Sequence, residues 1–211
     1  IMSGFAENAG MSVTSSASFF AATFSKEPIG WLPSAPEGWT VEHLGWHDPL
    51  NQQKARQRTP SLGLRCLRGS GSATGPLIGG CAEVLEMLKG TPWWPPLTYW
   101  DGAILFYETS EDAPPDGQVL RWMRNFAAQG ILSRISGIVL GRPGGPMSDE
   151  QRKAQELAVL RALDEAELQD LPVIADLDIG HTDPILTLPY GATARIECQT
   201  PRVTILDAGV T

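Results

Sequence analysis

The sequence has few cysteines, an excess of acidic over basic residues and no long apolar run. Its 211 residues include three cysteines, and no two of them have the spacing of paired metal ligands. We therefore expect three reduced, mostly buried thiols and a cytoplasmic protein. The 16 Lys and Arg against 24 Asp and Glu give a net charge of −8, which argues against a nucleic-acid-binding surface. We therefore expect no nucleic acid as partner. Because no apolar run reaches the length that spans a bilayer, we also expect no membrane as partner.

The first third of the chain is rich in Trp, Pro, Gly and polar residues. The opening "IMSGFAENAG" does not read as a natural start, and a helix-like stretch, "SVTSSASFFAATFS", follows it. We then expect short strands joined by turns near Gly30–Leu32, Trp39–Leu44 and Leu64–Leu67. The tip around Asp48–Pro60 is predicted to be exposed and mobile.

From Pro76 onward the pattern becomes that of an α/β protein. The stretch "PLIGGCAEVLEMLKG" predicts a glycine turn that leads into a helix. The runs "GAILFYE", "SGIVLGRP" and "PVIADLD" are mainly apolar, which is typical of strands buried on both faces, and amphipathic helices alternate with them. This order predicts a mostly parallel sheet with crossover helices. The tail predicts a C-terminal antiparallel meander.

Two polar residues stand at predicted strand ends. Glu108 closes "GAILFYE", and His181 comes shortly after "PVIADLD". Functional groups of open α/β sheets gather at the carboxyl ends of strands, where a carboxylate could fix the tautomer of an imidazole. From the positions alone, a capping acid and a solvated turn histidine are the favoured interpretation.

Other candidates have a weaker basis. Asp176, Asp178 and His181 could form a metal triad, since strand alternation puts the two acids on one side. The sequence supplies no further ligand cluster, so we expect no metal and no other cofactor. His43 and His47 have no acid–serine arrangement around them and are predicted to be surface residues.

Two glycine-rich stretches could also carry chemistry. "GSGSATG" lacks the lysine of a phosphate-binding loop and the strand–turn–helix context of a nucleophile, so we interpret it as a flexible turn. "LIGG" could offer backbone amides to an anion at a helix start, or could simply allow close packing. The sequence does not separate these two interpretations.

Four stretches, in chain order, resemble successive motifs of the LD-carboxypeptidase superfamily: "LIGGCAEVLEMLKGTPWWP", "GAILFYETSED", "GIVLGRPGG" and "PVIADLDIGHTDPILTLPYGATARI". The Trp-rich insertion and the "ETSE" motif are more similar to its microcin C immunity branch than to its murein-recycling branch. The resemblance implies a serine hydrolase with a Ser-His-Glu triad. In the family, an N-terminal domain carries the serine and the oxyanion-hole amides, and a C-terminal domain carries the glutamate and the histidine.

The resemblance assigns roles to particular residues. It implies that Glu108 is the triad acid and His181 the base, and that Gly79, Gly80 and Cys81 contribute to substrate binding. Relatives often have an asparagine where this chain has Cys81, so the polar contact of that side chain is in question. The family further implies a small peptide or peptidyl-nucleotide substrate, no cofactor and a homodimer.

The resemblance also divides the chain. Residues 1–75 would be the end of a missing N-terminal domain followed by a helix and a linker, and residues 76–211 the catalytic C-terminal domain. No serine here occupies the nucleophile's context. We therefore expect the chain alone to be inactive, because a base without a nucleophile has nothing to deprotonate. The alternative is a truncated, non-catalytic paralogue that binds a peptide or a partner.

Overall fold

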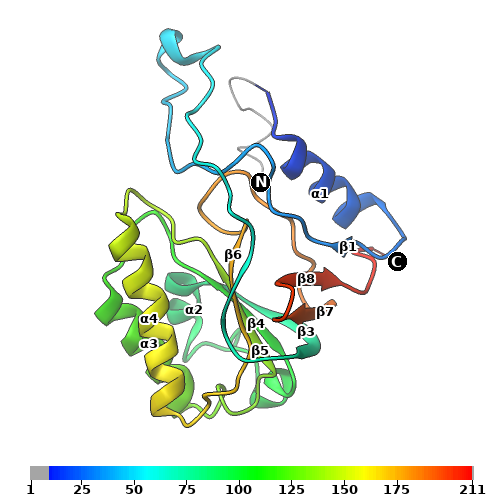
Figure 1. The fold of residues 1–211 in the computed structure, drawn as a ribbon, viewed down its shortest axis with the longest axis vertical. Coiled ribbons are helices and arrows are strands. Elements are labelled where there is room, and N and C mark those ends of the chain that lie inside the picture. Colours follow the sequence, from blue (N-terminus) through cyan, green and yellow to red (C-terminus); the bar gives the residue numbers. More distant parts are fainter. Residues whose placement is uncertain (1–9, 211) are drawn as a thin grey trace.

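Within residues 10–210, eight strands form a single mixed sheet in the order β1-β8-β7-β3-β4-β5-β6-β2 (Figure 1). The computed structural model describes residues 10–210. The four central strands run parallel to one another: β3 (Ser72–Cys81), β4 (Ile104–Glu108), β5 (Gly137–Gly141) and β6 (Val173–Leu177). Their apolar residues are largely buried, as the unbroken hydrophobic runs predicted. The predicted α/β class with a mostly parallel sheet is confirmed.

The crossover helices cover one face of this sheet. They are α2 (Ala82–Leu88), α3 (Asp116–Ala128) and α4 (Asp149–Glu165), with a short 3-10 helix, η3 (Leu97–Trp100), before β4. The side chains of Trp100, Met123 and Phe126 are fully buried between helices and strands. Within residues 10–210, no helix combines the length and the apolar character that crossing a bilayer requires.

Antiparallel strands complete both edges of the sheet. On one side β7 (Thr193–Glu197), β8 (Arg202–Ile205) and β1 (Gly30–Trp31) continue from β3. On the other side β2 (Arg65–Arg68) pairs with β6. The predicted C-terminal meander is therefore present, as part of the same sheet, and the N-terminal third adds a strand to each edge.

A helix from the N-terminal third, α1 (Val13–Phe24), lies beside the segment that follows His181. Ser12 caps this helix by accepting a hydrogen bond from the Ser15 amide. The Ser15 and Ser18 hydroxyls accept hydrogen bonds from the backbone amides of residues 185 and 187 at 2.9 and 2.8 Å. These contacts join α1 to the C-terminal half of the chain.

Two sequence predictions differ from the structure. The glycine turn predicted at residues 76–81 is instead the second half of β3. Pro76 and the glycines are typical of turns, so the sequence pattern did not indicate a strand. A side chain at Gly79 would place its Cβ 1.8 Å from the Phe106 carbonyl oxygen, so glycine permits the close approach of β4. The strand expected at Trp39–Leu44 is reduced to two single β-bridges, because Trp39 pairs with Thr59 whereas Thr40 pairs with Asp183.

The tip at residues 48–60 is largely exposed, as predicted, and its mobility stays a prediction. The tip carries a 3-10 helix, η2 (Pro49–Asn51), and projects from the body (Figure 1); Leu50 is 86% exposed. The opening nine residues lie outside the described part of the chain. The division at residue 75 stays a prediction, and β3 runs through that position.

Candidate active site

The two residues predicted as acid and base meet at the carboxyl edge of the parallel strands. Glu108 ends β4, directly opposite Cys81 at the end of β3. His181 lies four residues beyond the end of β6, and its Nδ1 is 2.9 Å from Glu108 Oε2. The Glu108 side chain is 6% exposed, whereas that of His181 is 38% exposed. The acid is thus held inside, and the imidazole reaches the surface.

Glycines allow this meeting across the intervening strand β5. A Cβ on Gly141, the last residue of β5, would lie 2.8 Å from both Glu108 Cβ and Ile179 Cγ1. A Cβ on Gly180 would lie 2.2 Å from Glu108 Oε2, and the φ of +87° at Gly180 is one that glycine adopts readily. The loop after β6 can therefore cross the end of β5 and bring its histidine to the acid on β4.

Carboxylates surround His181 and favour its protonated form. Its Nε2 is 3.3 Å from Glu111 Oε2. Burial lowers the pKa of His181, but the hydrogen bond to Glu108 and the charges of Glu108, Glu111 and Glu83 outweigh burial and raise the pKa above its usual value. A neutral His181 that donates from Nδ1 to Glu108 presents the Nε2 lone pair outward, which is the arrangement of a general base.

Cys81 stands beside this pair. Its Sγ donates to Glu83 Oε2 at 3.1 Å, and burial, together with Glu83 and Glu108, raises the pKa of the thiol to about 12. Glu83 also accepts hydrogen bonds from the amide and hydroxyl of Ser110, so it anchors the loop after Glu108. Gly79, Gly80 and Cys81 thus lie at the same edge as Glu108, and their role in substrate binding stays a prediction.

A pocket of about 630 Å³ opens beside His181. His43 and Arg56 from the N-terminal third line it, together with Glu111 from the loop after β4. The Arg56 guanidinium donates to Asp183 Oδ2 at 2.6 Å. His43 is exposed, as predicted, but its place beside the proposed base was not foreseen, because it depends on how the N-terminal third folds over the sheet.

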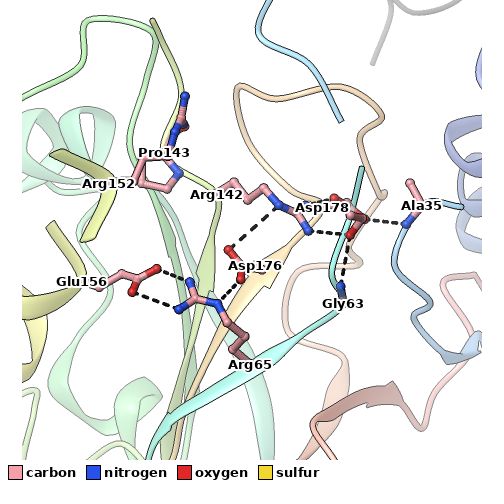
Figure 2. Close-up of polar contacts among 10 residues, drawn as sticks. Ala35, Gly63, Arg65, Arg142, Pro143, Arg152, Glu156, Asp176 and Asp178 are labelled. Atoms are coloured by element: carbon pink, nitrogen blue, oxygen red, sulfur yellow. Dashed lines mark hydrogen bonds and ion pairs between the residues drawn. The ribbon is translucent and has the colours of Figure 1, made fainter. Parts of the chain in front are cut away.

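The two aspartates of the alternative metal triad have other partners (Figure 2). Asp178 is completely buried; it forms an ion pair with Arg142 and accepts the Ala35 amide at 2.8 Å. Asp176 pairs with Arg65. Within residues 10–210, these aspartates and His181 do not form a group that could hold a metal. This triad is therefore wrong, because each aspartate neutralises an arginine.

The Arg142–Asp178 pair connects three segments behind the proposed base. Burial raises the pKa of Asp178, although Arg142 and the Ala35 amide act in the opposite direction. Arg142 also donates to the Ser61 hydroxyl at 2.9 Å. The pair thus ties residues 35 and 61 of the N-terminal third to the loop that carries His181. Apart from the acids at the end of β6, no sequence pattern predicted this cluster.

Comparison with known proteins identifies the family. A sequence profile described as the LD-carboxypeptidase C-terminal domain matches residues 74–196, more than half of the chain. The chain is 26% identical over 192 residues to the microcin C7 self-immunity protein MccF of Escherichia coli, covering 90% of this chain and 52% of MccF. It is 30% identical over 184 residues to YocD of Bacillus subtilis, which is named as a carboxypeptidase, covering 85% and 50%.

Solved structures agree with this assignment. MccF in complex with glutamyl sulfamoyl guanosine superimposes with a TM-score of 0.69 at 26% identity, covering 86% of this chain and 52% of that one. An MccF-like protein from Bacillus anthracis gives a TM-score of 0.72 at 27% identity, covering 92% and 56%. The chain spans about half the length of these relatives. It belongs to the LD-carboxypeptidase family, in the branch that contains MccF.

Proposed function

We propose that this chain supplies the glutamate and the histidine of a Ser-His-Glu triad to a serine carboxypeptidase or amidase. The observation that carries the proposal is the 2.9 Å contact between His181 Nδ1 and the buried Glu108 carboxylate. It leaves Nε2 on the accessible side, beside the pocket. The serine and the oxyanion hole would come from an N-terminal domain outside residues 1–211.

The geometry supports the following roles for the two residues. His181 Nε2 takes the proton of the serine hydroxyl as the serine attacks an amide carbonyl, and then returns it to the leaving amine. Glu108 accepts the Nδ1 proton, holds the ring in the required tautomer and stabilises the imidazolium. Because Glu108 is buried, its charge is screened little by solvent and acts strongly on the ring.

The proposed substrate is a small peptide or a peptidyl nucleotide. MccF has been solved with glutamyl sulfamoyl guanosine and with aspartyl sulfamoyl adenosine, both of which join an acidic aminoacyl group to a nucleoside. In this chain, Arg56 lines the pocket next to His181, where its guanidinium is already paired with the Asp183 carboxylate. Cytoplasmic location and homodimerisation remain proposals that the family resemblance suggests.

A serine-directed test separates this proposal from a non-catalytic one. The test uses the full-length protein, including any residues encoded upstream of Ile1. We expect a fluorophosphonate probe to label a serine outside residues 1–211. We also expect the protein to hydrolyse an aminoacyl sulfamoyl nucleoside or a murein tetrapeptide. Labelling should fall sharply in His181→Ala and persist in His47→Ala, since His47 is exposed and does not line the pocket beside His181. A protein that binds these ligands without labelling or turnover supports the alternative, a truncated binding paralogue.

Substitution of Glu111 by glutamine should change the pH dependence. The Glu111 charge helps to raise the pKa of His181, so its removal should lower that pKa. Because the base must be neutral, activity is lost as pH falls through the pKa of His181, and the acidic limb of kcat/KM should move to lower pH in Glu111→Gln. Proton NMR titration of the three histidines in metal-free buffer measures the same shift without substrate.

The exposure of Glu111 sets the size and the salt dependence of this effect. Its side chain is 71% exposed, so the shift should be modest and should shrink as ionic strength rises. The matched control is Glu27→Gln, an exposed acid on the N-terminal side of β1. An unchanged His181 titration in Glu111→Gln at low salt would contradict the assigned contact.

A further inference from the structure

Cys81, Glu108 and His181 bring three different metal-ligating groups together at the strand ends. One ligand atom from each residue lies within 4.8 Å of the others. The donor atoms around a tetrahedral zinc are roughly 3.3–3.7 Å apart, given Zn–S and Zn–N distances of about 2.3 and 2.0 Å. Small side-chain movements therefore suffice to close the three groups around one ion.

The local charge also favours a cation. Glu108 is buried against His181, Glu83 is hydrogen-bonded to Cys81, and Glu111 lies 3.3 Å from His181 Nε2. Three carboxylates thus surround the thiol and the imidazole. The pocket beside His181 provides a path for an ion from solvent, and Glu111 lines it, where its carboxylate could serve as an additional ligand.

We propose that Cys81, Glu108 and His181 form a binding site for zinc or another thiophilic divalent cation. The sulfur ligand selects such ions over magnesium and calcium, which prefer oxygen ligands alone. On binding, the thiol proton leaves to solvent and the thiolate, one carboxylate oxygen and one ring nitrogen coordinate the ion. The sequence led us to expect no metal site, because it linked His181 to the aspartates at the end of β6 and did not place Cys81 beside it.

The consequence for activity rests on the proposed function. If Glu108 and His181 are the triad acid and base, a bound ion occupies both and stops proton transfer. Hydrolysis by the full-length protein would then be inhibited by zinc and restored by a chelator. Binding itself depends on no catalytic step, so it can be measured independently of activity.

Metal binding by the untagged chain tests this site directly. We expect isothermal titration with Zn²⁺ to give one ion per chain, and Cd²⁺ to produce thiolate-to-metal absorption in the ultraviolet. Cys81→Asn and Cys81→Ser should abolish that absorption and weaken Zn²⁺ binding by at least about tenfold. His181→Ala should also weaken binding at least about tenfold while leaving the thiolate available.

The other two cysteines provide matched controls. Cys66 and Cys198 both donate to the Arg68 carbonyl oxygen, away from the Glu108 edge. Cys66→Ser and Cys198→Ser should keep wild-type affinity and absorption. No zinc uptake by the wild-type chain, undiminished uptake by both Cys81 variants, or loss of uptake in Cys66→Ser would each overturn the proposal, whatever the outcome of the hydrolysis assays.

Discussion

Replacing His181 with alanine in the full-length protein is expected to lower kcat by about 10³-fold or more, because removal of a triad base eliminates most of the rate of a serine hydrolase. Substrate binding should change little, so KM is expected to stay within a few-fold of wild type. The side chain is partly exposed and ends in the pocket, so its truncation leaves no cavity in the core. Steady-state hydrolysis of an aminoacyl sulfamoyl nucleoside measures the effect.

Substitution of the triad acid provides a second test of the same assignment. Glu108→Gln keeps the volume of the side chain but removes its charge, and it should lower kcat by about 10²–10⁴-fold through the loss of tautomer and imidazolium stabilisation. His47→Ala and Glu27→Gln alter exposed residues and should match wild type. Turnover at the wild-type rate by His181→Ala, with circular dichroism showing an intact fold, would refute the triad assignment.

Replacing Arg142 with methionine is expected to lower the free energy of unfolding by about 3–5 kcal/mol, the typical effect of removing one partner of a buried ion pair. The arginine and aspartate side chains are 6% and 0% exposed. Without the guanidinium, Asp178 remains a buried charge that still accepts the hydrogen bond of the Ala35 amide. Urea unfolding followed by circular dichroism measures the change.

A double variant identifies the cause of that loss. Adding Asp178→Asn to Arg142→Met removes the uncompensated charge, so the double variant should be more stable than Arg142→Met alone. Arg124→Met is the matched control, because Arg124 pairs with Glu165 at the surface and its removal should leave stability essentially unchanged. A double variant less stable than Arg142→Met would show that packing, rather than charge, dominates at this position.

The sequence predicted the parallel core well because its signal is local. β4, β5 and β6 are short, mainly apolar runs, and α4 begins with a capping box formed by Ser148 and Gln151. The sequence did not predict β3, because Pro76 and three glycines interrupt its pattern. Gly79 is needed in the strand because β4 approaches it closely. This contact joins segments that are far apart in the sequence, so a local pattern does not reveal it.

The sequence predicted the central pair of the candidate site, but it did not predict the residues that surround this pair. The strand ends and the family resemblance together led to Glu108 and His181. The contacts of Glu83, Glu111 and Arg142 depend on which loops meet at the edge of the sheet, so no spacing in the sequence predicted them. Cys81 was identified as a departure from the family pattern, and only the parallel register with Glu108 shows what it lies beside.

The backbone bridge between Thr40 and Asp183 has a mechanical consequence. The Thr40 amide donates to the Asp183 carbonyl at 2.8 Å, and the Asp183 amide donates back to the Thr40 carbonyl at 2.9 Å. Asp183 lies two residues after His181, and Thr40 belongs to the N-terminal third of the chain. This pair of hydrogen bonds therefore joins the N-terminal third to the loop that carries His181. A displacement of the segment around Thr40 would therefore act, through these two hydrogen bonds, on the loop that carries His181.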